Sequence, residues 1–150
     1  MIFLFRRRLI KRLDVDLIRK AIIEAEMRTS GEIRVSIAHY FWGRVRPAAE
    51  RTFRHLRMDR TRLRNGVLFF IVPARRRFVV LGDEGLHARV GQEFWDGLAA
   101  VLSSHFRKGE FTDGLVEAVR RAGLKLAAHF PYDPASDANE LPDEIDIRKS

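Results

Sequence analysis

Apolar residues recur at helical spacing in several parts of the chain. Residues 16–28 carry such a stripe, with Asp14 or Asp16 available as the N-cap, and this helix should stop at 29–31. Residues 47–57 form a second predicted helix, because Pro47 suits a first turn. After a short helical turn at 85–87, two longer helices are predicted on either side of 108–110. The last ends near 130–131 and has Thr112 or Asp113 as its cap.

Three other segments have the pattern of β-strands. Residues 33–38 alternate between apolar and polar side chains, which predicts a strand with one solvated face. Residues 67–72 are apolar throughout, as expected for a central strand that is covered on both faces. Residues 78–81 follow after a short link, which permits a hairpin. The first two strands are joined through a helix and should instead be parallel.

These elements predict an α/β fold, a three-layer α/β/α sandwich with a small mixed sheet of three to four strands. A chain of 150 residues, 46% hydrophobic and 32% charged, fits one compact domain. We place this domain at residues 14–131, after a basic extension at 1–13 and before an acidic tail at 132–150. The tail is rich in Asp, Pro and Ala, a composition typical of extended chain.

The predicted topology brings three turns to one edge of the sheet. Two parallel strands begin at this edge and the antiparallel third strand ends there, so Glu32, Asn65 and Asp83 converge, with Glu84 beside Asp83. Carboxylates gathered in this way repel one another unless a cation or a proton relieves them. Oxygen ligands on a loop suit calcium, with magnesium as the alternative. The edge is therefore a candidate site for a divalent cation.

Each of these residues also has a structural interpretation. Asp83 can cap the helix that follows while Glu84 is solvated, and Asn65 can be part of a tight turn. Arg64 can clamp an anionic substrate through a bidentate hydrogen bond, or it can be solvated. Asp113 joins the site only if its loop swings toward this edge, and otherwise it caps the last helix.

The composition and the absence of several motifs exclude some classes of catalytic and metal site. The chain has no cysteine, which excludes disulfides, thiolate nucleophiles and thiolate metal sites. It has no phosphate-binding loop, no dinucleotide fingerprint and no nucleophile elbow, and its five histidines show no ligand-like spacing. Any metal must therefore be bound by oxygen or imidazole ligands.

The chain is strongly basic, with a formal net charge of +8 and a pI near 10.7. Its basic residues are scattered rather than set between stacking aromatic residues, so we do not expect nucleic-acid binding. Residues 2–13 combine apolar side chains with five basic ones, and they either lie on an anionic membrane surface or form the first helix of the domain. Their apolar stretch precedes the basic one, the reverse of a secretory signal. A cytoplasmic location, with membrane-peripheral contact as a variant, is the expectation.

An ordered series of short motifs resembles the short soluble branch of the TPM domain family. The similarity covers roughly residues 16–145. The motifs are Glu24-Ala25-Glu26, Thr29-Ser30-Gly31-Glu32-Ile33-Arg34-Val35, Arg64-Asn65-Gly66-Val67-Leu68, Leu81-Gly82-Asp83-Glu84-Gly85-Leu86-His87, Val90-Gly91, Phe94-Trp95, Lys108-Gly109-Glu110-Phe111, Gly114-Leu115 and Asn139-Glu140-Leu141-Pro142-Asp143-Glu144-Ile145.

The resemblance implies an α/β/α sandwich with a calcium site, because several members of that family bind calcium. Carried over by motif, the metal positions are Glu32, Asn65, Asp83 and Glu84, with Asp113 as a further candidate. The family is called phosphatase-like after a plant thylakoid-lumen member that has acid phosphatase activity and is linked to photosystem II repair. The basic extension at 1–13 departs from the family pattern.

Two classes of function therefore stand beside each other. A phosphomonoesterase would use the metal as a Lewis acid and to activate a water, with Arg64 neutralising developing charge, or would use Asp83 as the nucleophile. The alternative is a non-catalytic module whose metal-ordered loops dock a protein partner in a membrane complex. The sequence leaves both open.

Overall fold

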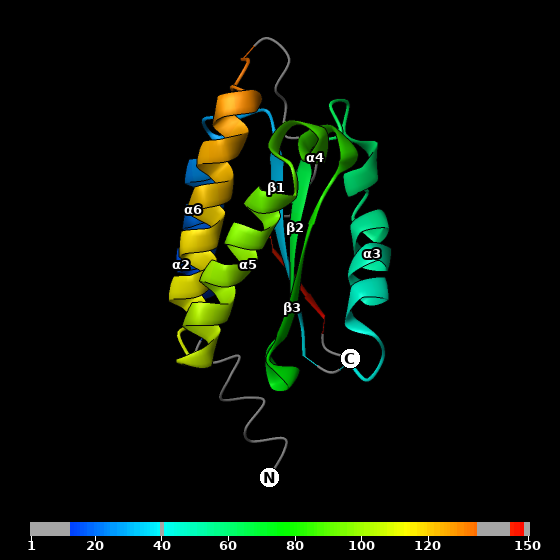
Figure 1. Ribbon diagram of the computed structural model, residues 1–150, viewed down its shortest axis with the longest axis vertical. Helices are drawn as coiled ribbons and strands as arrows, with labels where there is room; N and C mark the ends of the chain where they lie inside the picture. The colour runs from blue at the N-terminus through cyan, green and yellow to red at the C-terminus, as the bar shows by residue number, and fades with distance from the viewer. Residues whose placement is uncertain (1–12, 40, 135–144, 149–150) are drawn as a thin grey trace.

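The computed structural model describes residues 13–39, 41–134 and 145–148 (Figure 1). Its helices are α2 (Val15–Glu26), α3 (Val45–His55), α4 (Glu84–Val90), α5 (Gln92–Arg107) and α6 (Phe111–His129), with short 3-10 turns η1 (Met58–Arg60) and η2 (Pro73–Arg75). Its strands are β1 (Glu32–Ala38), β2 (Gly66–Val72), β3 (Arg77–Gly82) and β4 (Ile145–Arg148). The helices and first three strands expected from the hydrophobic pattern are all present, with small shifts at their ends.

The strands form one mixed sheet in the order β3-β2-β1-β4. As predicted from the linkers, β2 is parallel to β1 and β3 is antiparallel to β2. Glu32 pairs with Gly66, and the amide nitrogen of Asp83 donates to the carbonyl oxygen of Gly66 at 2.9 Å. The starts of β1 and β2 and the end of β3 therefore share one edge of the sheet. We call Glu32, Asn65, Asp83 and Glu84 the acidic edge.

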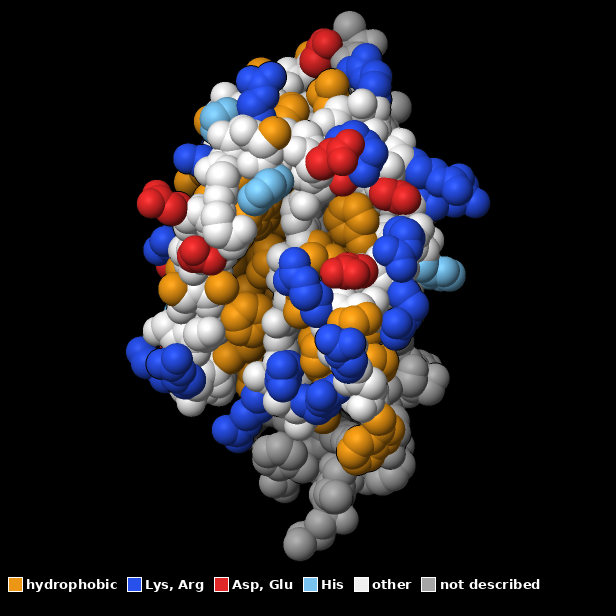
Figure 2. All heavy atoms as spheres, turned by 45° about the vertical axis from the view of Figure 1, so that its right-hand side comes forward, with side chains coloured by type: hydrophobic (Ala, Val, Ile, Leu, Met, Phe, Trp, Pro, Cys, Tyr) orange, Lys and Arg blue, Asp and Glu red, His pale blue; other side chains and the backbone are white. Residues whose placement is uncertain are grey.

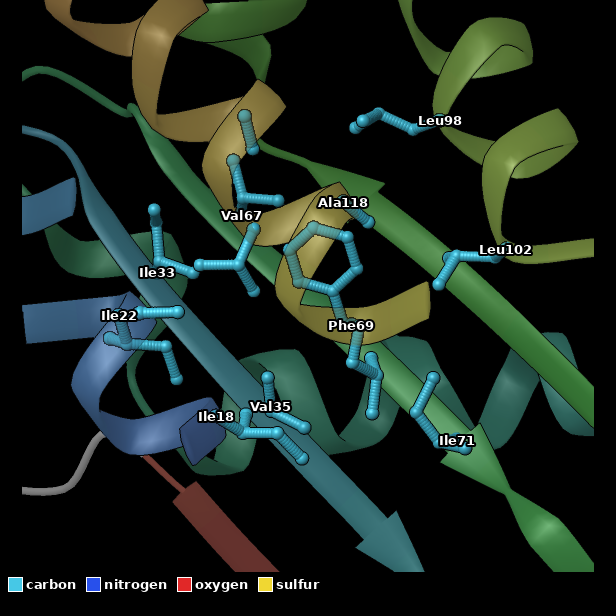
Figure 3. Close-up of a cluster of buried hydrophobic side chains, with 14 of the residues drawn as sticks. Ile18, Ile22, Ile33, Val35, Val67, Phe69, Ile71, Leu98, Leu102 and Ala118 are labelled. Carbon is cyan, nitrogen blue, oxygen red and sulfur yellow. The ribbon is translucent and has the colours of Figure 1, made fainter. Parts of the chain in front are cut away.

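Helices cover both faces of the sheet (Figure 1). Helices α2, α5 and α6 pack on one face, where Val35 and Phe69 meet Leu98, Leu102 and Ala118 in the larger core (Figure 3). Helix α3 covers the other face, where Phe53 packs with Leu68 and Phe70. The three-layer α/β/α sandwich is confirmed.

Strand β1 differs from its prediction, because it has no solvated face. All of its residues are buried, and the side chain of Arg34 is only 1% exposed. The polar residues of the alternating pattern face the side of the sheet that α3 covers. Arg34 is stable there because two carboxylates neutralise it, as described below.

The acidic tail differs from its prediction as well. We expected residues 132–150 to lie outside the domain, and the structure instead places β4 in the sheet, parallel to β1. Residues 145–148 pair with 35–38, and the hydroxyl of Ser36 donates to Asp146 Oδ2 at 2.9 Å. Four residues gave too little periodicity for a strand to be predicted, and only the pairing with β1 defines it.

The caps of two helices were predicted with unequal success. Asp14 caps α2 as expected, accepting from the amide nitrogen of Leu17 at 3.1 Å. The predicted cap of α6 at Thr112 or Asp113 is wrong, because the N-cap position is Glu110. Thr112 Oγ1 instead accepts from the amide nitrogen of Asp14 at 3.0 Å and so joins the start of α6 to the start of α2.

The basic extension lies largely outside the described residues. Of residues 2–13, for which membrane contact was one expectation, the structure describes only Leu13, which is buried in the larger core. Within the described ranges, no helix combines the length and the apolar character needed to cross a membrane.

Candidate functional site

A single arginine joins two carboxylates of the acidic edge. Arg64 Nε and Nη2 donate to the two carboxylate oxygens of Asp83 at 2.6 and 2.9 Å. Arg64 Nη1 lies 3.2 Å from Glu84 Oε1. The hydrogen bond with Asp83 is the main cause that raises the pKa of the Arg64 guanidinium above its ordinary value, against an opposing contribution from desolvation. One permanent cation is therefore shared by two carboxylates.

The backbone around Arg64 is closely fitted to α4. Arg64 has a positive φ of 50°, which is uncommon for a residue with a side chain, and its carbonyl oxygen accepts from the amide nitrogen of Leu86 at 3.1 Å. A Cβ at Gly85 would lie 2.2 Å from the carbonyl oxygen of Leu63 and 2.8 Å from that of Arg64. Glycine at position 85 thus permits the contact that presents Arg64 to Asp83.

Asp83 also caps α4, as its structural interpretation predicted. Its Oδ1 accepts from the amide nitrogen of Glu84 at 2.8 Å, and its side chain is buried. Gly82, just before it, lies against the ring of Trp95, because a Cβ there would come within 2.1 Å of that ring. Trp95 Nε1 in turn donates to His87 Nδ1 at 2.9 Å. The end of β3 is therefore held tightly in place.

Glu32 is neutralised from within the fold by a different arginine. Arg34 Nη2 lies 3.2 Å from Glu32 Oε2, and Arg34 Nη1 lies 3.0 Å from Glu26 Oε2. Glu26 Oε2 also accepts from the amide nitrogen of Ile33 at 3.1 Å, which ties the end of α2 to the start of β1. The repulsion expected among the carboxylates is thus relieved by two arginines, one buried and one half-exposed.

Asn65 lies at the same edge and is buried. Its Nδ2 donates to Ser30 Oγ at 3.4 Å, and its amide nitrogen donates to Thr61 Oγ1 at 3.4 Å. Asn65 therefore connects the turn before β2 to the turn before β1.

Asp113 lies far from the acidic edge. It is in the first turn of α6, whereas the last turn of α6 reaches the edge, where the amide nitrogen of Ser30 donates to the carbonyl oxygen of Phe130 at 3.0 Å. Seventeen residues separate Asp113 from Phe130, which is about 25 Å along a helix. The structure does not bring Asp113 to the other candidates.

The geometry can be tested against the metal that the sequence suggested. No three His, Cys, Asp or Glu side chains of the described residues are grouped closely enough for one ion. Asp83 and Glu84 are the donors that fit a cation best, because both already contact the same cationic group. Binding a metal there requires Arg64 to yield its place.

The sequence analysis missed the buried network of Arg34 and Glu26. Both residues belong to motifs that resemble the TPM family, but the sequence pattern gives neither of them a role. A signal was present, since Glu32 and Arg34 are two residues apart on one strand and therefore share a face. The alternating pattern instead suggested that this face was solvated.

Comparisons with known proteins agree with the fold. The family model for the TPM domain matches residues 7–124. The chain is similar to the NMR structure of BA42 protein from the psychrophilic bacterium Bizionia argentinensis sp. nov., with 37% sequence identity, a TM-score of 0.81, and coverage of 90% of this chain and 94% of that chain. The curated proteins contain no match. Since the family model covers most of its length, the chain belongs to the TPM domain family.

Proposed function

We propose that this TPM domain binds a divalent cation, calcium with magnesium as the alternative, through Asp83 and Glu84. The observation that supports this is the position of Arg64, whose guanidinium lies within 3.2 Å of both carboxylates. Two carboxylates that share one cation are arranged to accept another. The cation and Arg64 therefore compete for the same oxygens.

Glu32 and Asn65 have a supporting role in this proposal. Glu32 already pairs with Arg34, and Asn65 donates to Ser30, so both hold the turns of the edge in register. Calcium takes six to eight oxygen ligands, so water and backbone carbonyl oxygens complete the set around the two carboxylates.

We favour a non-catalytic role, in which the cation changes the turn that contains Arg64 and so controls docking of a protein partner in a membrane complex. The alternative is metal-assisted phosphomonoester hydrolysis with Asp83 as nucleophile. In the structure both oxygens of Asp83 accept hydrogen bonds, one from Arg64 Nε and the other from Arg64 Nη2 and the amide nitrogen of Glu84. The lone pairs of both oxygens are engaged in these hydrogen bonds, which makes the carboxylate a poor nucleophile.

Competition with Arg64 gives the sharpest test of the cation site. Arg64→Gln removes the competing charge and should tighten calcium binding about thirtyfold, since a divalent ion and a unit charge about 4 Å apart interact by about 2 kcal/mol in water. Arg60→Gln is the matched control, because Arg60 is a nearby exposed arginine and the change in net charge is the same. Asp83→Asn should abolish binding. Isothermal titration calorimetry with calcium chloride measures all three.

Linkage provides an independent readout. Calcium at ~100 times its dissociation constant should raise the free energy of unfolding of the wild-type protein by about 2.7 kcal/mol. A melting curve that is indifferent to calcium, magnesium and chelator would overturn the cation site. Equal affinities of Arg64→Gln and Arg60→Gln would overturn the competition.

Turnover of p-nitrophenyl phosphate separates the two functional classes. The non-catalytic proposal predicts no turnover by the wild-type protein, with or without calcium or magnesium. Turnover that is lost in Asp83→Asn would establish the phosphatase alternative instead.

A further inference from the structure

Arginines gather at the end of the sheet opposite the acidic edge. Three segments meet there: the loop between β1 and α3, the first turn of α3, and η2 with the start of β3. We call this surface the basic end, and its members are Arg44, Arg46, Arg75, Arg76, Arg77 and Trp42. Figure 2 shows Lys and Arg side chains gathered on the lower part of the view, where they outnumber acidic ones among the described residues.

The loop and the η2 turn are joined by Arg75. Its Nη1 donates to the carbonyl oxygens of Phe41 at 3.2 Å and Gly43 at 2.6 Å. Its guanidinium carbon lies 5.9 Å from the centre of the Phe41 ring. Residues more than thirty positions apart in sequence therefore form one continuous surface.

The charge of the basic end is largely uncompensated within the described part of the protein. Arg44, Arg76 and Arg77 make no ion pair with any described residue. Arg46 pairs with Glu50 at 3.5 Å, but both side chains are exposed, and such pairs are weak. Like charges gathered in this way favour the approach of an anionic partner.

The basic end also presents a large aromatic side chain to solvent. Trp42 is 73% exposed, whereas Trp95, the other tryptophan, is 8% exposed in the core. The loop behind Trp42 is closely packed, because a Cβ at Gly43 would lie 2.7 Å from the Phe41 ring. Tryptophan is enriched where a protein meets the headgroup region of a bilayer, since its ring is apolar and its N–H is polar.

We propose that the basic end docks on an anionic lipid bilayer. The arginines contact lipid phosphates, and the indole of Trp42 lies among the headgroups. A single-stranded nucleic acid would instead need a row of aromatic platforms along a basic groove. Within the described part of the basic end, Phe41 is covered by Arg75, which leaves one exposed aromatic ring at the tip.

Docking in this way fixes the orientation of the domain. The seven residues of β1 separate the two ends of the sheet by about 20 Å. The acidic edge therefore faces away from the bilayer and remains open to the aqueous phase.

Vesicle binding tests this proposal with the full-length protein. Vesicles of phosphatidylcholine and phosphatidylglycerol in equal amounts should bind the protein, and vesicles of phosphatidylcholine alone should not. The double variant Arg44→Glu with Arg77→Glu should bind at least about tenfold more weakly, since each basic residue near the surface contributes several-fold. Lys20→Glu with Arg120→Glu makes the same change in net charge on exposed positions of α2 and α6, and it should lose less than about twofold.

The tryptophan contributes a separate spectroscopic readout. Brominated lipid should quench part of the wild-type emission, and Trp42→Ala should remove this quenching because Trp95 is buried. Trp42→Ala should also weaken binding about fivefold. Circular dichroism and thermal melting verify that each variant is folded.

Three results would overturn the proposal. The first is equal binding by the two double variants, which would place any membrane contact elsewhere, as in residues 2–13. The second is wild-type emission that brominated lipid does not quench. The third is displacement of the protein from vesicles by a single-stranded oligonucleotide. This result would count against the proposal if the oligonucleotide acts at a lower concentration than micelles of phosphatidylglycerol.

Discussion

At the acidic edge, Arg34 and Arg64 each lie against carboxylates, whereas at the basic end Arg44, Arg76 and Arg77 have no ionic partner among the described residues. The first group is built into the fold, with short hydrogen bonds and glycines that permit close backbone contact. The second group is exposed. Net charge alone does not distinguish them. An arginine of this chain is therefore a candidate for external binding only where the fold leaves its charge unmatched.

The largest expected difference between the two ends comes from removing Arg34. Arg34→Met should cost about 3–5 kcal/mol in the free energy of unfolding, because Glu26 and Glu32 would lose the buried cation that neutralises them. Arg77→Met at the basic end should change it by less than about 0.5 kcal/mol. Urea unfolding followed by circular dichroism measures both.

A further variant identifies the source of the loss. Adding Glu26→Gln and Glu32→Gln to Arg34→Met should recover part of the stability, since the uncompensated carboxylates are then removed. Equal costs for Arg34→Met and Arg77→Met would contradict the distinction between the two ends.

A second prediction concerns the close backbone contact at the acidic edge. Gly85→Ala should destabilise the protein by about 1–3 kcal/mol, because the new Cβ would overlap the carbonyl oxygens of Leu63 and Arg64. Gly97→Ala is the control, since a Cβ there meets nothing within 4 Å. Alanine favours the helical conformation, so this variant should raise the free energy of unfolding by about 0.5–1 kcal/mol. Urea midpoints that move in the same direction for both variants would show that the contact is looser than described.

The smallest expected effect is a pH dependence of stability at His105. The arginines of the basic end do not titrate in this pH range. His105 lies 2.6 Å from Glu117 and 3.2 Å from Glu110, and the hydrogen bond with Glu117 is the main cause that raises the pKa of His105 above its ordinary 6.5. The folded state therefore prefers protonated His105. Its stabilising contribution is fully present below pH 6.5 and is lost as the pH rises through the raised pKa.

The measurement compares wild type with His105→Gln by urea unfolding across this pH range. The stability difference between them should shrink as the pH rises above 6.5. His55→Gln, at an exposed position on α3 with no ion pair among the described residues, should show no such trend. Vesicle binding through the basic end should stay constant over the same pH range. Vesicle binding that follows the titration of His105 would contradict the assignment of this binding to arginines.

Topology was predictable because linker lengths constrain it strongly. The short turn at 73–76 allowed only a hairpin, and the helix between β1 and β2 allowed a parallel pair. These two relations suffice to bring Glu32, Asn65 and Asp83 to one edge, which the structure confirms.

Charge pairing was much less predictable. The expectation of a repelling carboxylate cluster assumed that no cation came from the fold, yet Arg34 and Arg64 supply two. The pattern of apolar and polar residues does not give the positions of side chains. It therefore cannot tell which of the many arginines lies beside a carboxylate. Asp113 illustrates the same limit, because the sequence predicts the length of α6 but not that its end, at Phe130, is the part that meets the acidic edge.

The pairing of β4 with β1 has a consequence for synthesis of the chain. Ser36 and its partner Asp146 are 110 residues apart, so β1 emerges from the ribosome long before β4 can join it. At ~5–20 residues per second, this delay is on the order of ten seconds. During that time the outer edge of β1 has no strand from its own chain beside it, and such an edge can pair with a neighbouring nascent chain. Pairing with β4 then covers this edge of β1 and leaves the four-residue β4 as the edge strand, and such a short edge is a poor template for a neighbouring chain.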